Sequence, residues 1–394
     1  MERTNVNTLD KNAVVTTVFF LLILIAMAVL SAVLPKKSIS ELENRNLASM
    51  PKVSVQSLFD ESWVSGIQVY AQDHIAGRDR WINLCSSIET SVFRKTDKDD
   101  ILLGKDGWMF SKYFATEGAA QRQFDKNVDA VAKFCARYGG RVTFMLVPSA
   151  ALIYADKLPD WAPQIEESAL LDMAFSVVAA NGGRVLDLRK TFFREKENIK
   201  LYYKTDHHWT TDGAYLAYRE YCTQMDIPAV FSTEVHTRQD VPGFLGTHYL
   251  ASRWNHARSE TLSYYVTDST MTVFKVGGED TFFPLYDMGL VNREKLPRVD
   301  KYGAFLDGNH GYVELSGSGR GKVLVVKDSY ANSFVPFLTE NYETVGVVDF
   351  RNFSYGPDSM IESRRYDEII LLYSFYNFME DNHVIYLNRP SVKS

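Results

Sequence analysis

The feature that most constrains the fold is a series of short apolar runs, each too short for a helix and each followed by polar or turn-forming residues. Strands that are buried on both faces of a parallel sheet have this composition. Helical stretches at 117–138 and 166–180 separate some of the runs, so the sequence predicts an α/β fold with a parallel, helix-covered sheet. The predicted strands are 141–147, 184–188, 323–326, 344–348 and 369–373.

A different kind of apolar run lies near the N-terminus. Ala13 to Leu34 carries no charged residue and is long enough, at about 1.5 Å per residue, to cross the hydrocarbon layer of a membrane. It is longer than the apolar part of a signal peptide, which is roughly 7 to 15 residues. We therefore expect an uncleaved anchor. Lysines and arginines on its two sides balance, so charge alone leaves the orientation open.

Charge and cysteine content exclude some classes of function. A net charge of -6 and a pI near 5.8 argue against a nucleic-acid-binding protein, which needs a basic face. Cys85, Cys135 and Cys222 form no close-spaced pair, so neither a disulfide scaffold nor a cysteine metal site is expected. The predicted organisation is a tail at 1–12, an anchor at 13–34, a tether with a helical segment at 35–100 and an α/β domain at 101–394.

Two local structures are predicted ahead of the main sheet. In the helical segment, an ion pair between Asp73 and Arg78 is expected to fix the joint between two helices. At the start of the α/β domain, Ile101 to Phe110 reads as two short strands joined by a turn at Gly104 to Gly107.

Ser329 is a candidate nucleophile because of where it falls on the predicted sheet. The strand Val323 to Val326 stops at Lys327-Asp328-Ser329, and 331–338 has helical composition. A turn between strand and helix lies at the carboxyl edge of the sheet, beside helix N–H groups that stabilise an oxyanion. Asp-Ser before a helix is also an ordinary N-cap. Ser149 follows another strand but lacks a local acid, so it is the weaker candidate.

A second candidate site is the segment Asp206-His207-His208-Trp209, which leads through Thr210 into a predicted helix at 214–225. In an extended loop, side chains two positions apart face the same way, so Asp206 and His208 are expected side by side and His207 elsewhere. A carboxylate that orients an imidazole makes a general base, as in the Ser-His-Asp arrangement. Two alternatives stay open: zinc ligands and a purely structural loop.

Other polar residues near Ser329 are candidates for supporting roles. Tyr330 offers a backbone N–H and Asn332 a side-chain amide to an oxyanion. Arg351 follows the strand at 344–348, where it either binds an anionic or sugar group or pairs with Asp349 or Asp358.

The segment Asp206-His-His-Trp209, with Gly213-Ala214 after it, resembles the DHHW family of bacterial membrane-anchored proteins. More distantly it is similar to the SGNH-hydrolase-like alginate O-acetylation proteins, which carry Asp-x-His-Trp and, much later, Gly-Asp-Ser. The resemblance covers roughly residues 40 to 390. Further similar segments occur in the same order at 43–47, 73–78, 104–110 and 147–148.

The resemblance implies an SGNH-like sheet on which Asp206 and His208 precede the nucleophile Ser329 in the chain. It also implies transfer or removal of O-acetyl groups on polysaccharide outside the membrane, often with a membrane-bound acyltransferase as the acyl donor. The large domain is then extracytoplasmic. Lys327 stands where the wider group has Gly.

The resulting hypothesis is a membrane-anchored O-acetyltransferase or acetylesterase that acts on cell-envelope polysaccharide or exopolysaccharide through an acyl-serine intermediate. No metal or other cofactor is expected. The alternative is a catalytically silent scaffold that binds a glycan or a membrane acyltransferase, and Lys327 is the feature that favours it.

Overall fold

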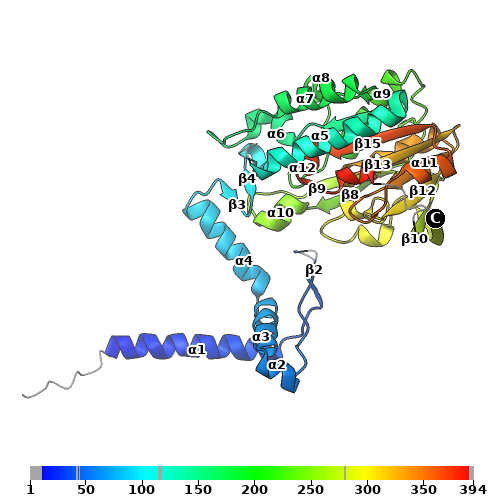
Figure 1. The fold of residues 1–394 in the computed structure, drawn as a ribbon. Helices are drawn as coiled ribbons and strands as arrows, with labels where there is room; N and C mark the ends of the chain where they lie inside the picture. Colours follow the sequence, from blue (N-terminus) through cyan, green and yellow to red (C-terminus); the bar gives the residue numbers. More distant parts are fainter. Residues whose placement is uncertain (1–10, 41–42, 44, 114–117, 279–280, 390–394) are drawn as a thin grey trace, which may run out of the picture. The chain divides into compact units, whose positions relative to one another are not determined.

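The computed structural model describes residues 11–40, 43, 45–113, 118–278 and 281–389. The chain divides into two compact units, Met1–Arg94 and Lys95–Ser394 (Figure 1). The first unit begins with helix α1, Lys11–Val33, whose side chains are almost all exposed and apolar. By length and composition this helix is able to cross a membrane, and the predicted anchor at 13–34 falls on it. Most of the predicted tail lies outside the described residues.

The rest of the first unit is held by ion pairs between a two-stranded ribbon and a helical segment. Arg45 Nη2 lies 2.5 Å from Asp73 Oδ1, and Arg78 Nη2 lies 2.7 Å from Glu43 Oε1. The predicted Asp73–Arg78 pair is therefore wrong, because each residue pairs with the 43–45 segment, which folds back onto the helices. The elements are β1 (Ile39–Ser40), β2 (Arg45–Asn46), α2 (Val55–Phe59), α3 (Ser62–Asp73), α4 (Arg78–Ser87) and a π-helix (Ile88–Val92).

The second unit is built on an eight-stranded sheet in the order β11-β10-β12-β14-β13-β15-β6-β7. Strands β14, β13, β15, β6 and β7 are parallel, and β12, β10 and β11 add antiparallel strands at one side. The sheet is thus mixed, and the predicted all-parallel arrangement is correct for only one part of it. The strands are β6 (Val142–Val147), β7 (Arg184–Val185), β10 (Thr270–Gly278), β11 (Thr281–Gly289), β12 (Tyr312–Ser316), β13 (Lys322–Lys327), β14 (Thr344–Val348) and β15 (Glu368–Ser374).

The sheet is covered on both faces, as the side chains of strand β13 show. It lies between β14 and β15, and its side chains at 323–326 are fully buried. Val323 and Val325 pack into one core cluster together with residues of α9, whereas Leu324 and Val326 pack into another with residues of α5 and α7. Each such side chain contributes roughly 1.5–3 kcal/mol by burial. The α-helices of this unit are α5 (Ala119–Tyr138), α6 (Ala150–Ile153), α7 (Glu167–Ala180), α8 (Arg189–Glu195), α9 (Thr211–Gln224), α10 (Thr247–Ser252), α11 (Asp358–Arg364) and α12 (Phe375–Glu380).

Two small sheets accompany the main one. Strands β3 (Asp97–Lys98), β4 (Ile101–Leu103) and β5 (Met109–Ser111) form the first, and its β4–β5 hairpin confirms the predicted turn at 104–107. Strands β8 (Arg238–Phe244) and β9 (Glu260–Tyr265) form the second.

Two local predictions need correction. The strand expected at 184–188 is limited to Arg184–Val185. The helix expected after Ser329 consists of two short 3-10 helices, Ser329–Ser333 and Val335–Glu340, so the nucleophile turn has no long α-helix behind it. All three cysteines are free, and Cys85 is exposed while the other two are buried.

Candidate active site

The Asp206–Trp209 segment is held between a short buried strand-like stretch and α9. Tyr202 and Trp209 form an isolated antiparallel bridge. Thr210 caps α9, because its side chain accepts a hydrogen bond from the Gly213 N–H at 3.0 Å. The segment between these two fixed points bends rather than extends.

Asp206 and His208 lie side by side, as the spacing predicts. His208 Nδ1 lies 2.5 Å from Asp206 Oδ1, which also accepts the His208 backbone N–H at 2.9 Å. Thr247 donates its N–H and its hydroxyl to Asp206 Oδ2 at 2.7 and 3.0 Å. Burial alone would raise the pKa of Asp206, but the two neighbouring imidazoles and these donors hold it well below its usual range. The ionised carboxylate accepts a proton-bearing Nδ1, which leaves Nε2 of His208 free as a base.

Ser329 completes the arrangement on the other side of the imidazole. Its Oγ lies 2.8 Å from His208 Nε2, although the two residues are far apart in the chain. Ser329 is 9% exposed, His208 5% and Asp206 1%. The structure therefore brings the three predicted residues together in a nearly buried chain of hydrogen bonds.

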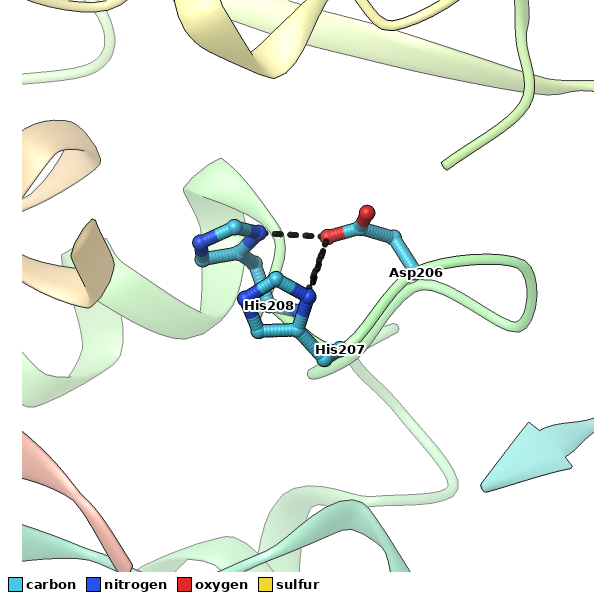
Figure 2. A group of neighbouring side chains, drawn as sticks. All are labelled: Asp206, His207 and His208. Carbon is cyan, nitrogen blue, oxygen red and sulfur yellow. Dashed lines mark hydrogen bonds and ion pairs between the residues drawn. The ribbon is translucent and has the colours of Figure 1, made fainter. Parts of the chain in front are cut away.

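His207 does not point away, contrary to the prediction. Its Nδ1 lies 4.0 Å from Asp206 Oδ1, and its ring centroid is 3.8 Å from that of His208 (Figure 2). The bend of the loop turns both imidazoles toward one carboxylate. Burial first, and then the neighbouring His208 imidazole, lower the pKa of His207 to about 3, so His207 is neutral near pH 7.

One ligand atom from each of Asp206, His207 and His208 fits within 4.8 Å, a grouping that suits a metal ion. A metal there would have to compete for the atoms that form the Asp206–His208 hydrogen bond. The contact of His208 with Ser329 fits proton transfer more directly.

Gly246 is a residue that sequence reasoning missed at this site. A Cβ at this position would lie 2.1 Å from Asp206 Cβ and 2.3 Å from its Oδ2. Only glycine lets the two backbones approach so closely. The stretch Gly243 to Thr247 is glycine-rich but lacks the spacing of a phosphate-binding loop, so the sequence alone does not single out Gly246.

The nucleophile turn is fixed by the carboxylate of Asp328. Its Oδ1 accepts the Tyr330 N–H at 2.9 Å. Its Oδ2 accepts the N–H and hydroxyl of Ser374 at 2.9 and 2.7 Å and the Asn377 amide at 2.8 Å, which ties the turn to the end of β15. Trp209 links the turn to the histidine segment, because its indole N–H donates to the Tyr330 carbonyl at 2.9 Å.

Tyr302 is a second residue at this site that sequence reasoning missed. It begins the 3-10 helix Tyr302–Ala304, and its ring stacks on His208 with centroids 3.7 Å apart and planes 11° apart. Its hydroxyl lies 3.2 Å from the Ser329 carbonyl and 3.0 Å from Ser333 Oγ. Tyr302 therefore contacts the segments of both the base and the nucleophile.

The two predicted oxyanion donors have protein acceptors in this structure. The Tyr330 N–H bonds to Asp328, and Asn332 Nδ2 bonds to the Gly308 carbonyl at 3.3 Å and to Asn309 Oδ1 at 3.1 Å. Their predicted role requires these hydrogen bonds to be shared or exchanged when a substrate binds.

Arg351 and Lys327 meet at one buried carboxylate. Arg351 Nη2 and Lys327 Nζ lie 2.6 and 3.0 Å from Asp349 Oδ2, which is the pairing alternative raised for Arg351. Lys327 also donates to Asn309 Oδ1 at 2.8 Å. Its side chain is thus buried and paired.

Ser149, the weaker nucleophile candidate, is bound to an acid after all. Its Oγ donates to Glu167 Oε2 at 2.5 Å, and its N–H donates to Oε1 at 2.7 Å. Burial raises the pKa of Glu167 to about 7, although the Ser149 hydrogen bonds oppose this shift. The Ser149 hydroxyl is committed to the cap of α6 and to Glu167.

Fold and site together define an α/β protein in which an Asp-x-His pair is hydrogen-bonded to a serine in the turn that follows a later strand. The family model described as "DHHW protein" matches residues 116–348, and the chain belongs to this family. This confirms the resemblance seen in the sequence.

Two solved structures share the fold. A DHHW family protein from Eubacterium siraeum is 22% identical with a TM-score of 0.61, covering 75% of this chain and 98% of that one. Bacillus cereus PatB1, solved with a sulfonyl adduct, is 18% identical with a TM-score of 0.58, covering 75% and 99%. At these identities the likeness shows the fold.

A curated relative matches part of the sequence. The probable alginate O-acetylase AlgJ of Pseudomonas syringae pv. tomato is 20% identical over 177 residues, which are 44% of this chain and 45% of the relative. The chain therefore matches less than half the length of this relative.

Proposed function

We propose that this chain is a membrane-anchored O-acetyltransferase or acetylesterase that acts on cell-envelope polysaccharide or exopolysaccharide. The observation that carries the proposal is the position of His208, with Nδ1 at 2.5 Å from Asp206 and Nε2 at 2.8 Å from Ser329. Similarity to a probable alginate O-acetylase supports an acetyl group as the group transferred.

The proposed reaction has two steps. Ser329 Oγ attacks the acetyl carbonyl while its proton passes to His208 Nε2, and the carboxylate of Asp206 stabilises the imidazolium. His208 then protonates the departing alcohol oxygen, which leaves an acyl-serine. In the second step a sugar hydroxyl or water gives its proton to His208 and takes the acetyl group, which restores Ser329. A sugar acceptor makes the enzyme a transferase, and water makes it an esterase.

Supporting groups are assigned to the oxyanion and to the substrate. The Tyr330 N–H and the Asn332 amide are the proposed oxyanion donors, once a substrate oxygen competes with their present acceptors. The guanidinium of Arg351 is partly exposed and remains a proposed contact to an anionic or sugar group.

The same proposal covers location and partners. Helix α1 anchors the chain in the cell membrane, and the second unit is extracytoplasmic, where envelope polysaccharide lies. A membrane-bound acyltransferase supplies the acetyl group. The apolar character of α1 supports the anchor, and the name of the alginate O-acetylase relative supports the polysaccharide.

The rival is a catalytically silent scaffold that binds a glycan or the acyltransferase. The small exposure of Ser329 and the engagement of the Tyr330 N–H with Asp328 favour this rival. It predicts the same fold without turnover.

Hydrolysis of 4-nitrophenyl acetate by the full-length chain in detergent separates the two. We expect Ser329→Ala and His208→Ala to lower the rate by at least about 10²-fold. A matched control is His383→Ala, because His383 Nδ1 pairs with Asp381 two positions earlier at 2.7 Å, away from the proposed nucleophile. Equal rates for wild type and Ser329→Ala would support the scaffold instead.

A further inference from the structure

A cavity of about 330 Å³ lies against the residues next to the base and the nucleophile. His207 and Tyr330 line it, and they are the sequence neighbours of His208 and Ser329. The other walls come from β4 and β5, from the start of α6, from α10 and from the start of α12. Its volume is at the small end of the range for ligand pockets, roughly 300–1,000 Å³, and an acetyl group alone would leave most of it empty.

We infer that this cavity is the subsite for the acceptor and that it takes an uncharged hexopyranose ring rather than a uronate. The inference rests on the proposed function, because it names the sugar that would receive or lose the acetyl group at Ser329. It follows from three features: the uncharged lining of the cavity, the aromatic pair at one wall, and the negative charge that lies behind another wall.

The lining carries no formal charge at neutral pH. Among the described residues that line the cavity there is no Asp, Glu, Lys or Arg. Its two histidines are neutral near pH 7, since burial lowers the pKa of His207 to about 3 and that of His248 to about 4. A carboxylate placed here would lose its hydration without a cation to compensate.

One charge behind the lining, that of Asp206, also disfavours an anion. The ionised Asp206 lies behind His207, 4.0 Å from its Nδ1. A uronate in the cavity would be repelled by this carboxylate through a medium of low polarity, whereas a neutral ring would not.

An aromatic pair and two polar side chains suit a sugar ring. Tyr113 and Tyr376 both line the cavity and stack on each other, with centroids 4.0 Å apart and planes 10° apart. The apolar C–H face of a pyranose packs on such rings, and its hydroxyls need polar partners. Ser111, whose Oγ lies 3.1 Å from His248 Nε2, and Asn377 offer them.

A second cavity provides the contrast. It has a volume of about 690 Å³ and is lined by charged side chains of both signs, among them Lys200, Arg238, Asp212 and Glu260. A uronate has possible cation partners there, so the two cavities predict opposite preferences.

The test is a titration of full-length Ser329→Ala protein in detergent with neutral trisaccharides (maltotriose, mannotriose, tri-N-acetylchitotriose) and with trimannuronate, by calorimetry. The Ser329→Ala background removes turnover, so binding is measured independently of catalysis. We expect at least one neutral trisaccharide to bind at least about 10-fold more tightly than trimannuronate. Adding Ala251→Trp, which fills the exposed mouth from α10, or Tyr376→Ala should weaken that binding at least about 10-fold.

Tyr286→Ala is the matched control, an exposed tyrosine on β11 outside the cavity, and it should leave the affinity unchanged. Melting temperatures show that each variant is folded, and Ala251→Trp removes no core contact. A preference for trimannuronate that Ala251→Trp weakens, absence of binding by all neutral trisaccharides, or an unchanged affinity in Ala251→Trp would overturn the inference. Failure of ester hydrolysis alone would overturn only the proposed function.

Discussion

Replacing Gly246 by alanine should disable the proposed base without removing any titratable group. The new Cβ would lie 2.1 Å from Asp206 Cβ, whereas ordinary contacts are 3.4–4 Å. Asp206 must therefore retreat by about 1 Å or more, which breaks its 2.5 Å hydrogen bond to His208. Misplacing a catalytic group by about 1 Å costs about 10²-fold, and full loss of the orienting carboxylate costs up to about 10⁴-fold.

We therefore expect kcat for 4-nitrophenyl acetate to fall between about 10²- and 10⁴-fold, equivalent to about 2.7–5.5 kcal/mol of activation free energy. The control is Gly140→Ala, because a Cβ there meets no atom within 4 Å. It should keep wild-type activity. Melting temperatures of both variants separate local misplacement from unfolding.

A milder change at the same carboxylate guards against loss of the fold. Thr247→Val removes the hydroxyl that donates to Asp206 Oδ2 at 3.0 Å and contacts His207 Nδ1 at 2.6 Å, and it keeps the backbone donor at 2.7 Å. We expect a loss of about 10- to 150-fold, which corresponds to roughly 1.5–3 kcal/mol for a hydrogen bond to a charged group. The reasoning is refuted if Gly246→Ala folds and retains activity within about 3-fold of wild type.

Three further predictions follow from buried contacts. Tyr302→Leu should lower kcat about 3- to 30-fold, because it removes the ring stacked on His208. Tyr302→Phe keeps the ring and should retain most of the wild-type kcat. Equal losses in the two variants would assign the role to the hydroxyl instead. Lys327→Ala should lower the free energy of unfolding by about 3 kcal/mol, measured by urea denaturation, because Asp349 loses a buried partner. An unchanged midpoint of the urea unfolding curve would contradict this. Burial raises the pKa of Glu167 from 4.5 to about 7. The contribution of Glu167 to the free energy of unfolding is therefore fully present below about pH 4.5 and is lost as pH rises through 7. Between pH 5 and 8 the free energy of unfolding of wild type should fall by about 2–3 kcal/mol relative to that of Glu167→Gln. Parallel curves of unfolding free energy against pH for the two proteins would refute this.

The sheet was predictable where its strands are buried on both faces. Apolar runs such as 323–326 and 344–348 predict strands that are buried on both faces, and in the structure they are neighbouring parallel strands. The antiparallel strands β10 and β11 escaped prediction because β11 is largely exposed and lacks such a run. Residue composition reports burial, so half-exposed edge strands leave a weaker signal.

The candidate site was predictable where local spacing determines direction. Asp206 and His208 meet because both belong to one short segment, and Ser329 was marked by the strand before it. His207 was misplaced because the loop bends instead of extending. Tyr302 and Gly246 act through contacts between distant segments, and a single sequence carries no sign of such contacts.

Covalent trapping at Ser329 tests the central claim most directly. Full-length protein is incubated with phenylmethylsulfonyl fluoride or 4-nitrophenyl acetate, quenched in acid and digested, and the modified peptide is found by mass spectrometry. The account predicts a sulfonyl or acetyl group on Ser329 that disappears in His208→Ala and persists in His383→Ala, because only an activated hydroxyl reacts. An unmodified Ser329, or equal labelling in the two histidine variants, would contradict it.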